Sequence, residues 1–211
     1  MNIKDYIEIL HPNKFNEAIQ RLIKVDDARE TLVNVLLLSF IGALTFVTES
    51  ILFYRFGGYA TTNQQLTVEQ QLVIEMEKRM LTPLGLTITF LDGIIIYYIS
   101  VAAFYAICRV LGGNGRLGNQ LYALAVLNVS YMLVNVPLAL LAQLPITIVQ
   151  VIMAFASLVV LIYTIYLEYK IARAINTSLD KIRAIAAVVG YLAVMFFITI
   201  LVGLIRLGLG I

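Results

Sequence analysis

Apolar residues along this chain form five long runs that are separated by shorter polar segments. The runs lie near residues 32–54, 84–107, 121–142, 146–167 and 185–207. Each run is long enough to cross the hydrocarbon core of a bilayer as a helix, which takes about 20 residues. The pattern predicts an all-α, polytopic membrane bundle with five transmembrane helices, formed by residues 31–211 and preceded by an N-terminal segment over residues 1–30.

The N-terminal segment has a helical pattern of its own. Its apolar positions fall three and four residues apart, which places them on one face of a helix: Phe15, Ala18, Ile19, Leu22 and Ile23. We expect Asn13 to cap this amphipathic helix. Two placements are open. The helix lies on the membrane surface with its basic flank toward anionic lipids, or it packs beneath the bundle. Asp27 and Glu30 have the spacing of a capping box and predict the start of the first span.

The connections between the later runs predict two further features. The connection over residues 55–82 contains "TVEQQLVIEMEKRM", for which we expect an amphipathic helix beginning at Thr67. The connection between the third and fourth runs is short and uncharged, so it predicts an antiparallel hairpin with a tight turn at Pro145.

Lys and Arg are distributed unequally between the two ends of the predicted bundle. Eleven of the 15 lie in the N-terminal segment and in the second and fourth connections, and these are Lys4, Lys14, Arg21, Lys24, Arg29, Arg109, Arg116, Lys170, Arg173, Lys181 and Arg183. Because positively charged loops stay in the cytoplasm, the N-terminus is predicted to be cytoplasmic and the C-terminus to be outside.

Composition narrows the possible functions. Hydrophobic residues make up 61% of the chain and charged residues only 13%, against about 25% charged residues in soluble domains. Cys108 and His11 are single residues of their type, which excludes an intrachain disulfide and the usual cysteine and histidine metal sites. No nucleophile lies beside a histidine base in a predicted span. We therefore expect no enzymatic activity, no cofactor and no nucleic-acid partner.

Polar residues within the predicted spans are the candidates for an intramembrane site. Asp92 lies near the middle of the second span, and Asn128 and Asn135 share one face of the third. Such groups either stabilise helix contacts by hydrogen bonding or bind a proton or a cation. Glu49 and Glu168 lie near the ends of their spans, and we expect them to reach the membrane interface.

The glycine-rich stretch "LGGNGRLGN" over residues 111–119 joins the second and third spans. It lacks the lysine of a P-loop, and it does not follow a strand as a dinucleotide-binding motif does. Glycine permits the positive φ angles that a sharp reversal needs. The stretch therefore predicts a turn between two membrane helices.

The order of these features resembles the Yip1 domain family. The marks that carry the resemblance extend over about residues 10–207: Pro12 and Phe15 before the first span, Leu111-Gly112-Gly113 after the second, Pro137 in the third, and Arg173-Ala174, Lys181 and Ala184 before the fifth. Two features depart from eukaryotic members. A long cytoplasmic N-terminal region is missing, and Leu127-Asn128 replaces a Gly-Tyr pair. The chain is more similar to a compact, prokaryotic-type member.

The resemblance implies an integral membrane protein, and the sequence shows no nucleophile–base pair or metal set that would favour an enzyme. Our first hypothesis is a scaffold that shapes the bilayer or recruits partners through the N-terminal helix and a cytoplasmic contact face, formed by Gly112, Gly113, Arg116, Arg173, Lys181 and Arg183. The resemblance implies a GTPase-type protein partner, in a plasma membrane for a prokaryotic source and in a Golgi or endoplasmic reticulum membrane for a eukaryotic one. The alternative is a small transporter or channel component with Asp92 as its proton or cation site, near Asn128 or Asn135.

Overall fold

The computed structural model describes residues 3–25, 27–56 and 78–209, and it is helical throughout these ranges apart from short turns. Two short helices come first, α1 (Ile3–Glu8) and α2 (Phe15–Leu22). Five long helices follow: α3 (Ala28–Phe56), α5 (Pro83–Val110), α6 (Leu117–Ala142), α7 (Thr147–Ile175) and α8 (Lys181–Leu209). Each of these five is long and apolar enough to cross a membrane, which confirms the predicted spans.

The long helices extend beyond the apolar runs from which they were predicted. The largest extension is in α7, which continues from the expected end at residue 167 to Ile175. This last part contains Tyr169, Lys170 and Arg173, whose amphipathic side chains suit the level at which a helix leaves the apolar layer. The predicted hairpin at Pro145 is confirmed, since α6 ends at Ala142 and α7 begins at Thr147.

Local signals explain where two of these helices begin. The Asp27 carboxylate accepts hydrogen bonds from the backbone N–H groups of Arg29 at 2.8 Å and Glu30 at 3.4 Å, so the predicted cap at the start of α3 is confirmed. At α5, the hydroxyl of Thr82 accepts from the Gly85 N–H at 3.2 Å, and Pro83 occupies the first helical position. Proline suits this position because its missing N–H has no partner in the first turn of a helix.

The predicted cap of α2 is wrong. The helix begins at Phe15, and Lys14 rather than Asn13 occupies the capping position, without a side-chain hydrogen bond. The backbone N–H of Asn13 donates to Nδ1 of His11 at 3.2 Å. Asn13 is thus part of the preceding turn, one residue too early to accept from the first free N–H groups of the helix. The helix expected from Thr67 lies almost entirely outside the described residues.

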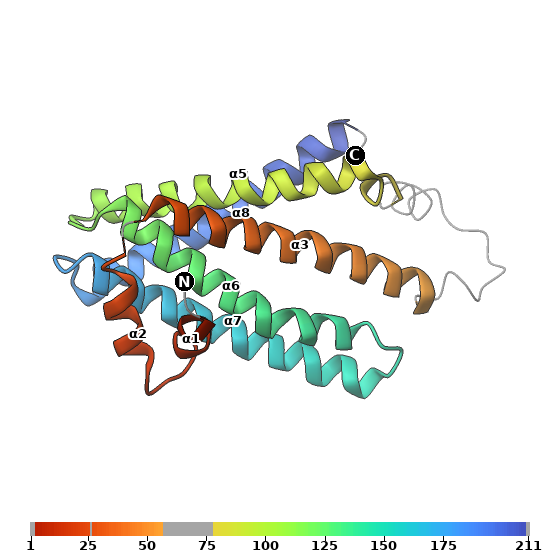
Figure 1. Cartoon of the computed structure of the whole chain (residues 1–211), viewed down its shortest axis with the longest axis horizontal. Helices are drawn as coiled ribbons and strands as arrows, with labels where there is room; N and C mark the ends of the chain where they lie inside the picture. The colour runs from red at the N-terminus through yellow and green to blue at the C-terminus, as the bar shows by residue number, and fades with distance from the viewer. Residues whose placement is uncertain (1–2, 26, 57–77, 210–211) are drawn as a thin grey trace.

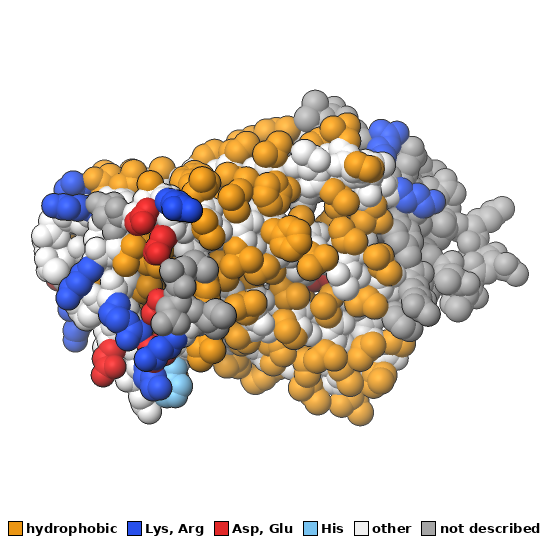
Figure 2. Space-filling view, viewed as in Figure 1, with side chains coloured by type: hydrophobic (Ala, Val, Ile, Leu, Met, Phe, Trp, Pro, Cys, Tyr) orange, Lys and Arg blue, Asp and Glu red, His pale blue; other side chains and the backbone are white. Residues whose placement is uncertain are grey.

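Helix α6 lies at the centre of the bundle and packs against α3, α5 and α7, while α8 packs against α5 and α7. Every residue from Tyr122 to Leu127 is buried, which no lipid-facing helix allows. The outer surface is apolar, with Ile148, Phe155 and Phe197 each about 70% exposed (Figure 2). Because large exposed apolar patches are rare on soluble monomers, this surface is the one that contacts lipid.

The N-terminal helices pack against the bundle rather than projecting from it. Phe15, Ala18, Ile19 and Leu22 are all at most 4% exposed, and α2 contacts α6 and α7. Two long-range hydrogen bonds hold this unit, from the Tyr163 hydroxyl to the Leu10 carbonyl at 3.1 Å and from the Asn119 side chain to the Ile23 carbonyl. The apolar stripe of α2 therefore faces protein.

The three basic segments meet at one end of the bundle, which we call the basic end. Figure 1 shows α1, α2 and the α5–α6 and α7–α8 connections together there, with the α6–α7 turn at the opposite end. In Figure 2 most of the visible Lys and Arg gather at the basic end, next to a broad apolar belt. Sequence segments more than 60 residues apart thus form one surface.

Candidate functional site

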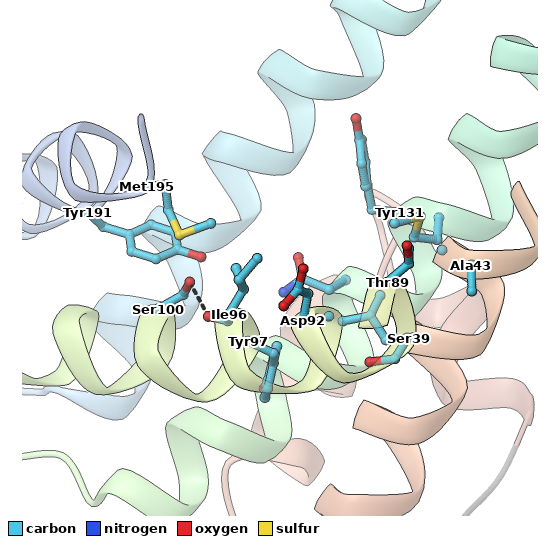
Figure 3. A pocket seen from close by; sticks show the side chains of 15 residues that line it. Ser39, Ala43, Thr89, Asp92, Ile96, Tyr97, Ser100, Tyr131, Tyr191 and Met195 are labelled. Atoms are coloured by element: carbon cyan, nitrogen blue, oxygen red, sulfur yellow. Dashed lines mark hydrogen bonds between the residues drawn. The ribbon is translucent and has the colours of Figure 1, made fainter. Parts of the chain in front are cut away.

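A pocket opens in the membrane-spanning part of the bundle, between α3, α5, α6 and α8, with a volume of about 440 Å³. Asp92 lines it from α5, together with Thr89 and Ile96, which lie one turn to either side on the same helical face. In Figure 3, Asp92 lies between Ser100 and Tyr191 at one end of the pocket and Thr89 and Ala43 toward the other. The carboxylate that the sequence singled out therefore faces a cavity.

A close contact between α3 and α5 forms one wall of this pocket. A Cβ atom added to Gly93 would lie 3.0 Å from Oγ and 3.2 Å from Cβ of Ser39, so glycine lets the two helices approach closely without displacing this side chain. Ser39 is 4% exposed, and its Oγ has no hydrogen-bond partner among the described residues. A buried hydroxyl without a partner is costly, and here it borders the cavity.

The structure brings together two of the three predicted intramembrane residues. Asn128 lines the pocket from α6, as Asp92 does from α5, and Tyr131 lies beside it one turn along. Asn135 does not line the pocket, because it lies two further turns toward the α6–α7 turn. Its Oδ1 is buried and has no hydrogen-bond partner within the described ranges.

Sequence reasoning missed Tyr97 and Tyr191, which also line the pocket. Tyr97 is 5% exposed and donates its hydroxyl hydrogen bond to the carbonyl of Leu121. Tyr191 comes from α8, whose residues near this level are otherwise apolar. A tyrosine far from the ends of an apolar run was the available signal, because its hydroxyl must find a polar neighbour there.

A second buried polar group lies closer to the basic end. Gln120 is fully buried and Glu168 is 7% exposed, and they lie at nearly the same distance along the α6–α7 hairpin from its turn. Both polar atoms of Gln120 and Oε2 of Glu168 lack hydrogen-bond partners in the part of the chain that the structure describes. Glu168 is enclosed by protein, although it lies between Tyr166 and Tyr169 on α7, so its expected place at the membrane interface stays a prediction.

At the basic end, two connections are joined into a unit that we call the loop latch, residues 112–115 and 176–178. The Asn176 side chain is fully buried, accepts from the Gly115 N–H at 2.9 Å and donates to the Ala172 carbonyl at 3.1 Å. Ser178 donates to the Gly112 carbonyl at 2.7 Å, and Asn114 donates to the Thr177 hydroxyl at 3.1 Å. These bonds tie the α5–α6 turn to the α7–α8 connection.

The glycines of the latch are required for two different reasons. Gly112 has φ of +92°, the left-handed region that the sequence predicted for a sharp reversal here. Gly113 and Gly115 instead make room, since a Cβ at either position would lie within 2.7 Å of Oδ1 of Asn176. No phosphate is needed to explain this glycine-rich stretch.

Most of the predicted contact face is exposed, with one exception. Gly112, Arg116, Arg173, Lys181 and Arg183 are exposed at the basic end. Gly113 is buried beneath the Asn176 side chain, so its place in the predicted contact face is wrong. Its role is to let the two connections approach.

Three aromatic–basic pairs mark the level at which the helices leave the apolar layer. The charged groups of Arg109, Lys170 and Arg173 lie 5.3–5.9 Å from ring centres, those of Tyr105, Tyr166 and Tyr169 respectively. Tyrosine and basic side chains of this kind are typical of the membrane–water interface. The loop latch lies beyond these pairs, at the basic end of the bundle.

The residues described contain no cluster of three or more His, Cys, Asp or Glu side chains that would hold a metal ion. The fold and the pocket define a class, a multi-pass membrane protein built on five apolar helices. A scan against protein-family models matches the Yip1 domain over residues 7–202, nearly the whole chain. The chain belongs to the Yip1 domain family. No curated protein and no solved structure gives a significant match.

Proposed function

We propose that this protein is a non-enzymatic membrane scaffold whose basic end recruits a protein partner at the cytoplasmic face of its membrane. The excess of Lys and Arg at this end supports a cytoplasmic location for it, with the C-terminus on the other side. The three aromatic–basic pairs lie at headgroup level, where Arg109, Lys170 and Arg173 contact anionic lipids. The partner carries an acidic surface, and the family suggests a GTPase-type protein.

The loop latch is the observation that carries this proposal. Membrane topology alone needs only positive charge in the cytoplasmic loops, and flexible basic loops would satisfy it. Here a fully buried asparagine and tightly packed glycines hold the two loops in one shape. Ordering a loop costs about 1–2 kcal/mol per residue in backbone entropy. A fixed arrangement of Arg116, Lys181 and Arg183 supports recognition of a particular surface.

The test reverses two exposed charges on this face. The variant carries both Arg116→Glu and Lys181→Glu. After crosslinking in native membranes, we expect the amount of partner recovered with it to fall at least tenfold, as measured by quantitative mass spectrometry. The matched control is Lys78→Glu with Arg79→Glu, which changes the same number of charges outside the basic end. Equal recovery of every crosslinked protein from both variants, each inserted normally, would contradict recruitment through the basic end.

The pocket supports a second candidate function, a proton or cation site at Asp92 in a small transporter or channel component. Asp92, Asn128 and Ser39 come from three helices and border one cavity. A purely structural aspartate would need only a hydrogen-bonding neighbour, whereas this one also faces open volume. A carboxylate within a span normally faces protein or water and marks a functional position.

A further inference from the structure

We propose that the Asp92 pocket binds a small lipophilic ammonium ion, meaning a protonated or quaternary amine that carries an apolar body. This inference does not depend on recruitment at the basic end. It rests on the Asp92 cation site of the second candidate function, but not on transport through it, and it gives that site a ligand class.

The dimensions and walls of the pocket fit a small organic molecule. Its volume of about 440 Å³ lies within the range of roughly 300–1,000 Å³ that is usual for small-molecule sites. Much of the wall is apolar, with Leu38, Met132 and Met195 facing the cavity from three different helices. A few polar groups converge in it, as in most ligand pockets.

The charge of the lining favours a cation. Among the described residues that line the pocket, Asp92 is the one acidic side chain, and none is Lys, Arg or His. An acyl chain in this space would supply no polar group to the Ser39 hydroxyl, which has no hydrogen-bond partner among the described residues. An anion would be repelled by the carboxylate. An ammonium group of either kind supplies a counter-charge to Asp92, and a protonated amine also supplies an N–H donor for polar oxygens of the lining.

The aromatic lining favours an organic cation over a metal ion. Tyr97, Tyr131 and Tyr191 line the pocket from three helices, and aromatic rings attract ammonium groups through their faces. Hard metal ions need about six or more oxygen ligands gathered at about 2.3–2.6 Å. A cavity of this size with methionine and isoleucine in its walls does not gather them.

The test compares three probes of similar shape on the full chain in zwitterionic lipid nanodiscs. Benzyltrimethylammonium carries a permanent charge, N,N-dimethylbenzylamine carries a protonatable one, and isobutylbenzene is the neutral isostere of that amine. We expect both cations to raise the unfolding temperature in a saturable manner and to bind at least tenfold more weakly to Asp92→Asn. Glu49→Gln is the matched control, because it removes an acid from a span without altering the pocket lining.

A second variant keeps the test valid where Asp92→Asn does not fold. Ala43→Leu places a larger side chain in the pocket and leaves the Asp92 carboxylate intact. We expect it to weaken the binding of both cations as well. Equal binding of isobutylbenzene and the cations would overturn the proposal in favour of an apolar ligand. No saturable binding to folded protein would overturn it as well.

Ion and proton flux in proteoliposomes separates this inference from the second candidate function. Flux that Asp92→Asn abolishes, together with no binding of the cationic probes, would retain a proton or inorganic-cation site and reject the ammonium site. Saturable binding that depends on Asp92, without flux, would retain the ammonium site and reject transport.

Discussion

At the residue scale, close packing decides the role of individual glycines in this protein. Gly93 brings α5 against Ser39 of α3, and Gly113 brings one connection against Asn176 of another. A Cβ added to Gly203 would meet no atom of the described residues within 4 Å. An added Cβ would thus be tight at Gly93, would clash at Gly113 and would meet nothing at Gly203, and only the surroundings distinguish these cases.

We predict that Gly113→Ala destabilises the protein by about 1–3 kcal/mol, the usual cost of overpacking. The added Cβ would meet Oδ1 of Asn176 at 2.6 Å and the Cys108 carbonyl at 2.7 Å, and the backbone atom cannot move without shifting α5. Reversible unfolding in detergent measures the change. Gly203→Ala is the control and should be neutral or slightly stabilising, because alanine favours the helix. Equal unfolding free energies for the two variants would show that the latch is not tightly packed.

At the element scale, α1 and α2 are held by an ion pair as well as by apolar contacts. Arg21 donates a hydrogen bond to the Glu8 carboxylate and lies 3.3 Å from Oδ1 of Asp5. The hydrogen bond from Arg21 is the main cause that lowers the pKa of Glu8 below its ordinary value, and Glu8 is 8% exposed. Tyr6 donates to Asn34 of α3, and burial raises the pKa of its hydroxyl to about 12, so it remains a donor.

This ion pair makes the docking of α1 and α2 dependent on pH. The pKa of Glu8 is lower in the folded protein than in the unfolded chain, whose carboxyl has a pKa of about 4.5. Its contribution to stability is therefore complete above that pH, and it is lost as the pH falls through the folded pKa. We expect hydrogen exchange of the α1 and α2 amides to accelerate, relative to its intrinsic rate, below about pH 4.5.

The control for this prediction removes the ionisable group at Glu8. Glu8→Gln should loosen α1 and α2 already at neutral pH and should reduce their acid sensitivity, whereas Glu17→Gln, at an exposed position of α2, should leave the profile unchanged. An identical acid profile in the native protein and in Glu8→Gln would assign the sensitivity to another group.

At the scale of the whole molecule, the two ends of the bundle differ in charge and in construction. The basic end combines the N-terminal helices with the loop latch, while the α6–α7 turn at the opposite end is short and carries no charge. This asymmetry supports one orientation in the membrane, with the basic end in the cytoplasm.

We predict this orientation for cysteine-labelling experiments in intact cells. A membrane-impermeant thiol reagent should label Pro145→Cys in the α6–α7 turn from outside and should label Ser178→Cys only after the membrane is permeabilised. Cys108 is fully buried, so the native thiol provides a low background. Labelling of Ser178→Cys in intact cells would reverse the proposed topology and move the recruitment surface outside.

Local patterns in the sequence predicted five spans, the hairpin at Pro145, the Asp27 cap and the turn at Gly112, all of which the structure confirms. These features depend on the length and polarity of neighbouring residues, because a helix in lipid satisfies its backbone hydrogen bonds within its own segment. The local pattern was wrong about Asn13, which it predicted as the cap of α2, because the first turn of that helix begins one residue later.

The tertiary structure alone decided which polar residues share a site. Asp92 and Asn128 border one pocket and Asn135 does not, Gly113 lies beneath Asn176, and the Glu168 side chain is enclosed by protein. Each outcome depends on the rotation and axial position of one helix against another, which side-chain packing sets across large sequence separations. The pattern within a single helix predicts how deep a residue lies in the membrane, but it does not predict which side chain of another helix lies opposite.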